Sequence, residues 1–209
     1  MRTSLTPPLS PHRQRKHDSM VQNILDTARV IMRDQGVAAL SMQELARRMD
    51  LRAPSLYNYF SSKTEIYDAL FRLGFTLYAE HMEKNWPHVH SWQDYVRFGF
   101  EGHLTFAIQN PELYQLCFER PVPGFVPSDE SLQISFGILE QSYQHAAGLR
   151  NDIQTDLPTQ QMVDLLIAMM HGITAQHMAN EPQLPIGQGR FGSLIPAALS
   201  LLEKAWSKS

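Results

Sequence analysis

Apolar residues recur three and four positions apart along most of this chain, and that period is typical of amphipathic helices. Residues 18–35 carry the first such stripe, which a glycine ends. A second, short helix is predicted from Ser41, because Glu44 follows at the spacing at which the two side chains cap a helix start. Residues 53–59 form a third short helix in this prediction, with Pro54 tolerated in its first turn.

Longer apolar stripes follow in the rest of the chain. Ser62 is predicted to cap a helix that ends near residue 85, with Glu65 at its third position. Further helices are predicted over residues 91–109, 111–120, 128–148, 158–180 and 190–206, the last with a kink at Pro196. No stretch shows a strand pattern, so we predict an all-α protein. Its amino-terminal unit has the three-helix plan of a helix-turn-helix, and a larger helical part follows.

The same pattern divides the chain into three parts. Residues 1–17 are rich in proline and lack acidic side chains, so they are predicted to be a flexible basic arm. Residues 18–63 hold the three-helix unit, and residues 64–209 hold the larger helical domain.

Charge is distributed unevenly between these parts, although the whole chain has a formal net charge of only −3. Residues 1–63 contain ten Lys and Arg against five Asp and Glu, a balance of +5. The remaining eight basic and sixteen acidic residues give −8. A basic head on an acidic body indicates a polyanionic partner for the head, and uneven surface charge without a partner is the alternative.

Composition narrows the class of protein. With 43% hydrophobic and 19% charged residues, the chain has enough apolar side chains for a packed core. No run of 18 apolar residues predicts a membrane span, and the first residues lack the apolar segment of a secretory signal. Cys117 is the single cysteine, so no intrachain disulfide is expected and a cytoplasmic location is favoured.

The short helix at residues 53–59 carries more hydrogen-bonding side chains than a buried helix needs. In a helix-turn-helix, the corresponding helix enters the major groove of DNA. The predicted DNA-contacting residues belong to this helix and to the helix starts on either side of it: Ser41, Gln43, Arg52, Ala53, Pro54, Ser55, Tyr57, Asn58, Tyr59 and Lys63. Phosphate contacts would fix the register, and base contacts would specify the sequence. A core position is the alternative for Tyr57, and an exposed position without a partner is the alternative for Asn58.

The segment ILDTARVIMRDQGVAALSMQELARRMDLRAPSLYNYFSSKTEIYDAL resembles the DNA-binding domain of the tetracycline-repressor (TetR) family of bacterial regulators. The matching residues keep their order and spacing across the segment. Asp50 and Leu51 stand where the family usually has Gly-Val, so Asp50 must take a conformation that Gly takes more easily. Arg52 stands where Ser or Thr is frequent, which adds a cation at the edge of the groove.

The resemblance implies a function and an assembly. TetR proteins are all-helical homodimers whose last two helices form the dimer interface, so helices 158–180 and 190–206 are the expected interface here. Such a homodimer would bind a pseudo-palindromic operator in double-stranded DNA as a repressor, and a small hydrophobic effector would release it. An activator role stays open. The segment MMHGITAQHM is similar to a His-Gly motif in one branch of the family.

An effector of this kind needs an apolar pocket with few polar groups. We expect the pocket among the helices of residues 91–180. Its candidate lining consists of aromatic, apolar and histidine side chains: Phe100, His103, Leu104, Phe106, Tyr114, Phe118, Phe136, Met170 and His171. Ordinary core packing is the alternative for each of them, because such residues at helical spacing are usual in cores.

Other functions have less support in the sequence. His88 and His90 are two residues apart, and the spacing of the other histidines with one cysteine forms no zinc pattern, so no metal and no cofactor is expected. No phosphate-binding loop or nucleophile motif occurs, which argues against an enzyme. A helical metal-dependent or enzymatic protein whose head does not bind DNA is the alternative. A body that docks another protein is a third hypothesis.

Overall fold

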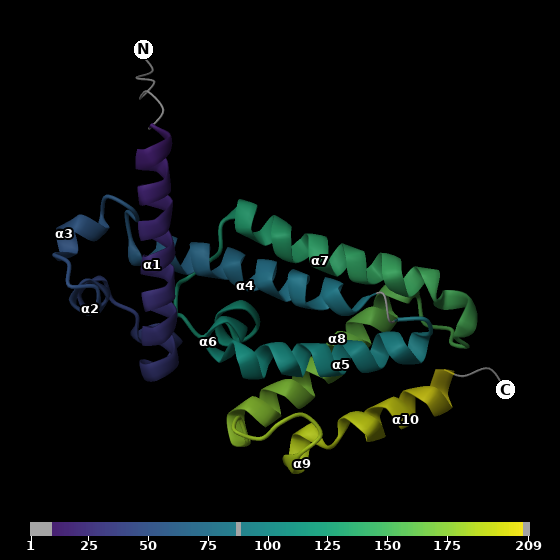
Figure 1. Cartoon of the computed structure of the whole chain (residues 1–209). Coiled ribbons are helices and arrows are strands. Elements are labelled where there is room, and N and C mark those ends of the chain that lie inside the picture. The colour runs from purple at the N-terminus through teal and green to yellow at the C-terminus, as the bar shows by residue number, and fades with distance from the viewer. Residues whose placement is uncertain (1–9, 87–88, 207–209) are drawn as a thin grey trace.

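The computed structural model describes residues 10–86 and 89–206, and every regular element in these ranges is helical (Figure 1). A small head contains α1 (Pro11–Gln35), η1 (Val37–Ala39), α2 (Met42–Arg48) and α3 (Ala53–Leu56). From the head, α4 (Lys63–Asn85) leads into a larger body. The body continues with α5 (Trp92–Gln109), α6 (Pro111–Tyr114), the π-helical turn η3 (Gln115–Glu119), α7 (Asp129–Gly148), η4 (Arg150–Asp152), α8 (Thr159–Asn180), α9 (Gly189–Gly192) and α10 (Ile195–Trp206). The predicted all-α architecture is confirmed.

The head folds around the apolar stripe of α1. Ile24, Ala28 and Ile31 are fully buried and belong to one core with Leu45 of α2 and Leu56 of α3. Neither short helix could be stable alone, because a few residues of helix form too few hydrogen bonds to offset their ordering. Packing on α1 therefore holds α2 and α3 in place.

Serine caps fix the starts of two of these helices. The Ser41 hydroxyl accepts a hydrogen bond from the Glu44 N–H (3.2 Å) at the start of α2. The Ser62 hydroxyl accepts one from the Glu65 N–H (3.2 Å) at the start of α4. Each cap occupies an amide that has no partner inside the helix. Both predicted helix starts are confirmed.

Two boundaries of the head differ from the prediction. The first helix begins at Pro11 rather than near residue 18, so residues 11–17 are helical instead of forming an arm. Proline suits that position, because the amide it lacks would have no helical partner. Residues 1–9 lie outside the described part of the chain. At the other end of the head, α3 stops at Leu56 rather than at residue 59, and the chain continues in a turn.

The last predicted helix is divided in two. A turn at residues 193–194 separates α9 from α10. Pro196 causes no kink, because it lies in the first turn of α10, where its missing N–H costs no hydrogen bond. One face of α10 belongs to a core shared with α5, through Ile195, Ala198, Leu202 and Trp206. The ring of Trp206 lies 6.1 Å from that of Trp92, measured between centroids.

A buried carboxylate joins the head to the body. The side chain of Glu112 in α6 has no exposed surface. It accepts hydrogen bonds from Arg29 Nε (2.8 Å) and from Arg33 Nη2 (2.9 Å), both on α1. Arg29 Nη2 also donates to Asn110 Oδ1 (3.0 Å). A buried carboxylate is tolerated only when cations and hydrogen bonds surround it, so α1 is tied to α6 at this point.

A second close approach brings α4 against η3. A Cβ atom added to Gly74 would lie 2.5 Å from Cys117 Sγ and 3.5 Å from Leu113 Cβ. Cys117 is buried, and its Sγ lies 3.7 Å from the Phe71 carbonyl oxygen. Position 74 therefore has room for a glycine only, which sets the distance between the two elements.

We expect Gly74→Ala to lower the free energy of unfolding by about 1–3 kcal/mol, because an added methyl group overpacks this contact. Urea denaturation followed by circular dichroism measures the change. Adding Cys117→Ala to the same chain should recover most of the loss, since it removes the sulfur that the new methyl meets.

The matched control is Gly137→Ala in α7, where an added Cβ meets nothing within 4 Å. That change should be neutral or slightly stabilising, because alanine is the better helix former. Equal destabilisation by both substitutions, or no recovery in the double variant, would show that the steric explanation is wrong.

Candidate nucleic-acid interface and internal cavity

One backbone position sets the turn between α2 and α3. Asp50 has a φ of 53°, in the left-handed region that residues other than glycine rarely adopt. The following residue, Leu51, donates its N–H to the Ala46 carbonyl (2.9 Å), which closes the end of α2. The left-handed conformation expected from the replacement of glycine by Asp50 is confirmed. Asp is one of the few residues whose short polar side chain tolerates it.

Leu56 is the buried residue of α3, and Ala53 and Tyr59 pack partly against the same core. Of the predicted DNA-contacting residues, those that are exposed are Gln43, Arg52, Pro54, Tyr57 and Asn58. Those that are partly buried are Ser41, Ala53, Ser55, Tyr59 and Lys63. Tyr57 keeps 54% of its surface exposed, so the alternative of a core tyrosine is wrong.

The early turns of α1 lie beside this surface. The ring centroids of His17 and Tyr59 are 5.2 Å apart, so the first helix touches the turn after α3. Arg13, Arg15 and Lys16 are exposed on the same turns, and none of them forms an ion pair within the described residues. The helical start of α1 therefore places cations close to the predicted DNA contacts.

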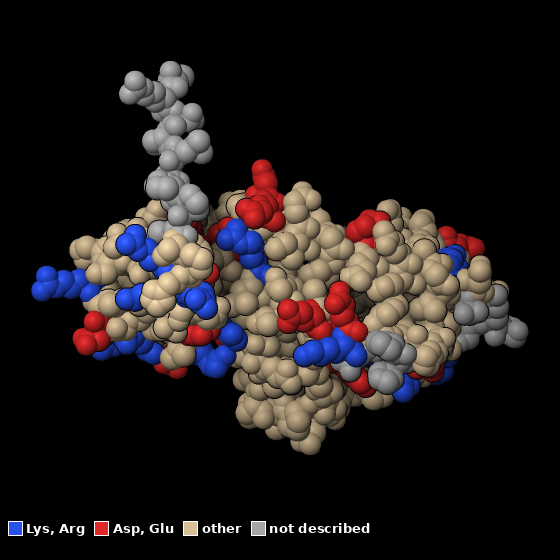
Figure 2. All heavy atoms as spheres, turned by 45° about the horizontal axis from the view of Figure 1, so that its top comes forward, with Lys and Arg blue, Asp and Glu red and all other residues tan. Residues whose placement is uncertain are grey.

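Other cations of the head are neutralised internally. Glu44 pairs with Arg47 (2.7 Å) and Arg48 (2.9 Å), and Arg48 also contacts Asp34 (2.8 Å). The hydrogen bonds from Arg47 and Arg48 lower the pKa of Glu44 to about 2. Arg48 thereby links α2 to α1, and both arginines are paired with carboxylates rather than adding free positive charge. Even so, most of the Lys and Arg atoms in Figure 2 gather over the head.

Backbone amides at the start of α4 already donate hydrogen bonds to the helix's own capping side chains. The Glu65 carboxylate accepts a hydrogen bond from the Ser61 N–H, and Ser62 accepts one from the Glu65 N–H. The Lys63 ammonium lies 5.7 Å from the centroid of the Tyr67 ring, a cation–π distance. Lys63 itself is half-buried, and its cation remains next to the exposed turn after α3.

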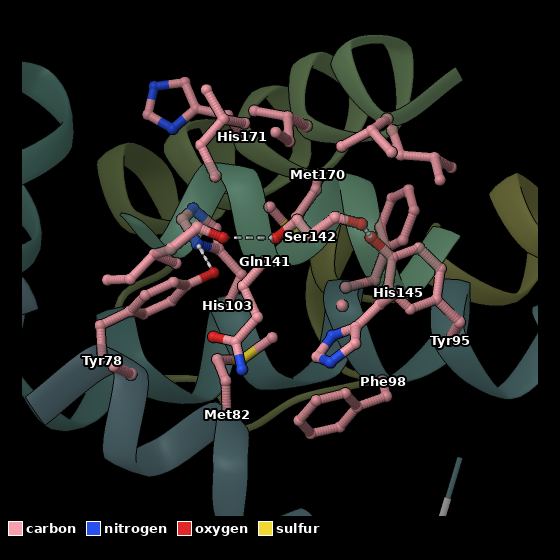
Figure 3. A pocket seen from close by; sticks show the side chains of 18 of the residues that line it. Tyr78, Met82, Tyr95, Phe98, His103, Gln141, Ser142, His145, Met170 and His171 are labelled. Carbon is pink, nitrogen blue, oxygen red and sulfur yellow. Dashed lines mark hydrogen bonds between the residues drawn. The ribbon is translucent and has the colours of Figure 1, made fainter. Parts of the chain in front are cut away.

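A cavity of about 780 Å³ lies in the body between α4, α5, α7 and α8 (Figure 3). This volume is in the range of small-molecule sites. Six of the predicted lining residues form part of its wall: Phe100, His103, Phe118, Phe136, Met170 and His171. The structure thus brings residues from separate helices together around one space.

Three predicted lining residues do not reach the cavity. Leu104 is fully buried in the core that α5 shares with α10, and Phe106 is buried in the core that includes the head. Tyr114 is also fully buried, and its hydroxyl lies 3.5 Å from His171 Nδ1, behind the wall. For these three residues ordinary core packing, the alternative, is correct.

The prediction also missed much of the wall. It placed the pocket within residues 91–180, but α4 lines one side with Phe75, Tyr78, Ala79, Met82, Glu83 and Trp86. The residues missed on α7 are Ser135, Ile138, Leu139, Gln141, Ser142 and His145. A signal existed in α4, because positions 75, 78, 82 and 86 are large and fall on one helical face. That face is equally typical of a core, so the sequence could not separate the two uses.

His103 is the buried polar group of this wall. Its side chain is 1% exposed, and its Nδ1 lies 3.3 Å from the Tyr78 hydroxyl, as Figure 3 shows. Nε2 is buried and has no hydrogen-bond partner among the described residues. Burial, with a smaller effect of His171, lowers the pKa of His103 to about 3. The ring is therefore neutral near pH 7 and can exchange one further hydrogen bond.

Within the described ranges, no three His, Cys, Asp or Glu side chains lie close enough together to hold a metal ion. His88, considered in the sequence, lies outside these ranges. His177 Nε2 lies 3.0 Å from the Leu184 carbonyl oxygen, a structural contact. No helix in the same ranges is both long and apolar enough to cross a bilayer.

Comparison with known proteins gives one family match and several relatives. Residues 24–70 match the profile described as bacterial regulatory proteins, tetR family. The HTH-type transcriptional regulator Rv1816 of Mycobacterium tuberculosis is 25% identical over 126 residues, which cover 59% of this chain and 54% of the relative. The chain therefore spans about half the length of the curated relatives it matches.

Solved structures share the fold over most of both chains. A protein with unknown function from Rhodococcus sp. RHA1 has a TM-score of 0.74 at 17% identity, covering 90% of this chain and 96% of that one. The transcriptional regulator FadR from Bacillus subtilis, in complex with stearoyl-CoA, has a TM-score of 0.66 at 15% identity, covering 87% and 96%. At identities this low, the structural similarity shows a common fold and nothing more.

We expect the buried His103 to make stability depend on pH. Its pKa is lowered from 6.5 to about 3 in the folded protein, so between these values the unfolded state binds more protons. The free energy of unfolding should therefore fall as the pH decreases below about 6.5, by at most about 1.4 kcal/mol per pH unit. His103→Gln should flatten this slope in urea denaturation between about pH 7 and pH 5.

His90→Gln, which replaces an exposed histidine, is the control and should keep the wild-type slope. The same slope for the wild type and for His103→Gln would contradict the assignment of a neutral buried ring.

Proposed function

We propose that this chain, a member of the TetR family of bacterial regulatory proteins, is a ligand-responsive transcriptional repressor. It binds a pseudo-palindromic operator as a homodimer and is released by a small hydrophobic effector. The observation that carries this proposal is the course of α4. Its first residue, Lys63, stands beside the exposed turn after α3, and its later turns form a wall of the apolar cavity.

The DNA contacts follow from the exposed side chains of the head. With α3 in the major groove, the hydroxyls of Tyr57 and Tyr59 donate to phosphates, and Asn58 meets a base edge or the backbone. Gln43, exposed at the start of α2, supplies a base contact. Arg52 and Lys63 flank this surface and neutralise phosphates.

The first turns of α1 extend the same surface. Arg13, Arg15 and Lys16 are exposed there, and the contact between His17 and Tyr59 keeps these turns next to α3. A rigid helix presents its charges at lower entropic cost than a mobile arm does. These residues therefore add phosphate contacts beside the groove.

The dimer interface uses the faces of α8 and α10 that the single chain leaves open. On α10 the exposed residues at helical spacing are apolar or small: Leu194, just before the helix, Ala197, Leu201 and Ala205. On α8 the corresponding residues are Leu165, Ala168 and Gly172. Leu201 is 64% exposed, which is costly in a monomer and is relieved by a second copy. Small residues on α8 allow the helices of two copies to approach closely.

Two elements connect the cavity with the head. Lys63 and Tyr78, on the same α4, stand about 22 Å apart along the helix axis, because each residue rises about 1.5 Å. In α6, Glu112 binds α1 and Tyr114 touches His171 of the wall. An effector that shifts either helix changes the separation of the two α3 helices in the dimer.

The energy required of the effector is modest. A thousandfold loss of operator affinity needs about 4 kcal/mol of preference for the released conformation. If the effector buries a few apolar groups in one conformation and leaves them exposed in the other, the difference provides that amount, at about 25 cal/mol per Å² of apolar surface.

We expect DNA fragments selected from a genome by the purified protein to contain pseudo-palindromes, and binding to them to depend steeply on salt. With about four phosphate contacts in each head, the slope of log affinity against log salt concentration should be about −7. A slope near zero would contradict DNA binding. Tyr57→Phe should weaken binding by about 10–100-fold on every sequence, because it removes a phosphate contact from each head.

Gln43→Ala should instead lower the preference for one base position, by about 1–3 kcal/mol, because it removes a base contact. Tyr143→Phe removes a hydroxyl in the body, 2.8 Å from Asp164, and should leave operator affinity unchanged. Identical sequence preferences for Tyr57→Phe and Gln43→Ala would show that these two roles are assigned wrongly.

We expect the wild-type chain to sediment as a dimer and Leu201→Arg to sediment as a monomer with unchanged helicity. A charge on this exposed apolar stripe would be buried without a partner in the dimer. Val126→Arg, which replaces another exposed apolar residue in the loop before α7, is the matched control and should remain dimeric. If Leu201→Arg remains a dimer, the interface lies elsewhere on the protein.

A further inference from the structure

The described cavity wall lacks the fixed positive charge that a site for an anionic ligand needs. Among the described lining residues there is no Lys and no Arg. The only carboxylates are those of Glu83 on α4 and Asp164 on α8, and both side chains are exposed. Every other lining group is apolar, aromatic or an uncharged polar group, apart from the histidines. The wall thus provides no fixed positive charge.

Of the three histidines in the wall, His171 has its Nδ1 3.5 Å from the Tyr114 hydroxyl, and the other two do not replace the missing cation. Burial lowers the pKa of His103 to about 3, and it also lowers the pKa of His145. The ring of His145 stacks on Trp86 with 3.6 Å between centroids. Both rings are therefore neutral near pH 7 and offer hydrogen bonds rather than charge.

Several polar groups of the wall are already engaged. The Tyr95 hydroxyl donates to the Ser142 carbonyl (3.2 Å), and the Ser142 hydroxyl donates to the Ile138 carbonyl (3.0 Å). The Gln141 amide extends into the space beside Met82 in Figure 3. Together with the unpartnered Nε2 of His103, it gives the wall a small capacity to bind a neutral polar group.

We propose that the effector is an uncharged lipophilic molecule with a hydrogen-bonding group, and that the cavity rejects carboxylates and phosphates. This inference rests on the proposed function, in which the cavity is the effector site. A carboxylate in this space would exchange water for a mostly apolar wall and gain no Lys or Arg, and the exposed Glu83 and Asp164 that border the space carry the same charge. A neutral headgroup loses less on leaving water, and hydrogen bonds with the amide and imidazole groups can offset that loss.

The same argument separates this chain from a regulator of the same fold. FadR from Bacillus subtilis was solved in complex with stearoyl-CoA, a ligand that carries phosphates. Phosphates require cationic or amide-rich partners, and the wall described here has neither Lys nor Arg. On this proposal, the cavity of this chain would not bind the phosphate groups of such a ligand.

A matched set of twelve-carbon probes tests the inference directly: 1-dodecanol, dodecanoate and dodecyltrimethylammonium, each below its micellar concentration. Binding to the full-length protein at about pH 7.5, without DNA, is followed by intrinsic tryptophan fluorescence, to which Trp86 in the wall contributes. We expect 1-dodecanol to bind at least about tenfold more tightly than dodecanoate. Equal or tighter binding of dodecanoate, tighter binding of the ammonium probe, or no binding of any probe would overturn the inference.

A charge placed in the wall should change this preference. Gln141→Lys should strengthen dodecanoate binding by about tenfold, with little effect on 1-dodecanol, because it supplies the missing cation. Gln144→Lys adds the same charge on the same helix outside the wall and should change neither affinity. A gain for dodecanoate in both variants, or in neither, would contradict the role given to the wall.

These measurements are independent of the DNA experiment. If 1-dodecanol binds but leaves the protein–DNA complex intact, release by an effector fails and the ligand class stands. If the protein binds DNA but none of the probes, the ligand class fails and DNA binding stands.

Discussion

The carboxylate of Glu112 lies between two guanidinium groups of α1 and has no contact with solvent. Breaking a buried ion pair costs about 3–5 kcal/mol when the remaining charge is left uncompensated. The contact therefore fixes α1 on the body, and α2 and α3 follow because they pack on α1. The position of the predicted DNA-contacting surface thus depends in part on one side chain of a four-residue helix.

The elements around that contact also form the cavity or touch its wall. Tyr114 follows Glu112 by two residues and reaches His171, and Gly74 brings α4 tightly against η3. Dense packing of this kind moves in units rather than yielding locally. In the proposed mechanism, a molecule that enters the cavity acts on helices that reach the head. The proposal assigns the choice of ligand to the neutral wall and the binding of DNA to the cations of the head.

The sequence predicted what depends on neighbours along the chain. Serine caps, including those of Ser91 and Ser128, need only a few residues, and they mark helix starts correctly. Contacts between residues far apart in the sequence could not be predicted from it. Arg29 and Arg33 were counted as free charge on the head, yet their partner lies about 80 residues away. The stripe of α4 identified a buried face, but only the position of α7 and α8 shows that part of this face borders a cavity.

The left-handed Asp50 has a consequence for how this protein can vary. Any residue with a branched Cβ would strain the backbone there, while Gly, Asn and Asp fit. The backbone therefore restricts the side chain at position 50, whereas it places no such restriction on the exposed Tyr57 and Asn58. A relative that keeps this turn is expected to keep a residue there that tolerates the left-handed conformation, whatever its neighbouring exposed side chains are.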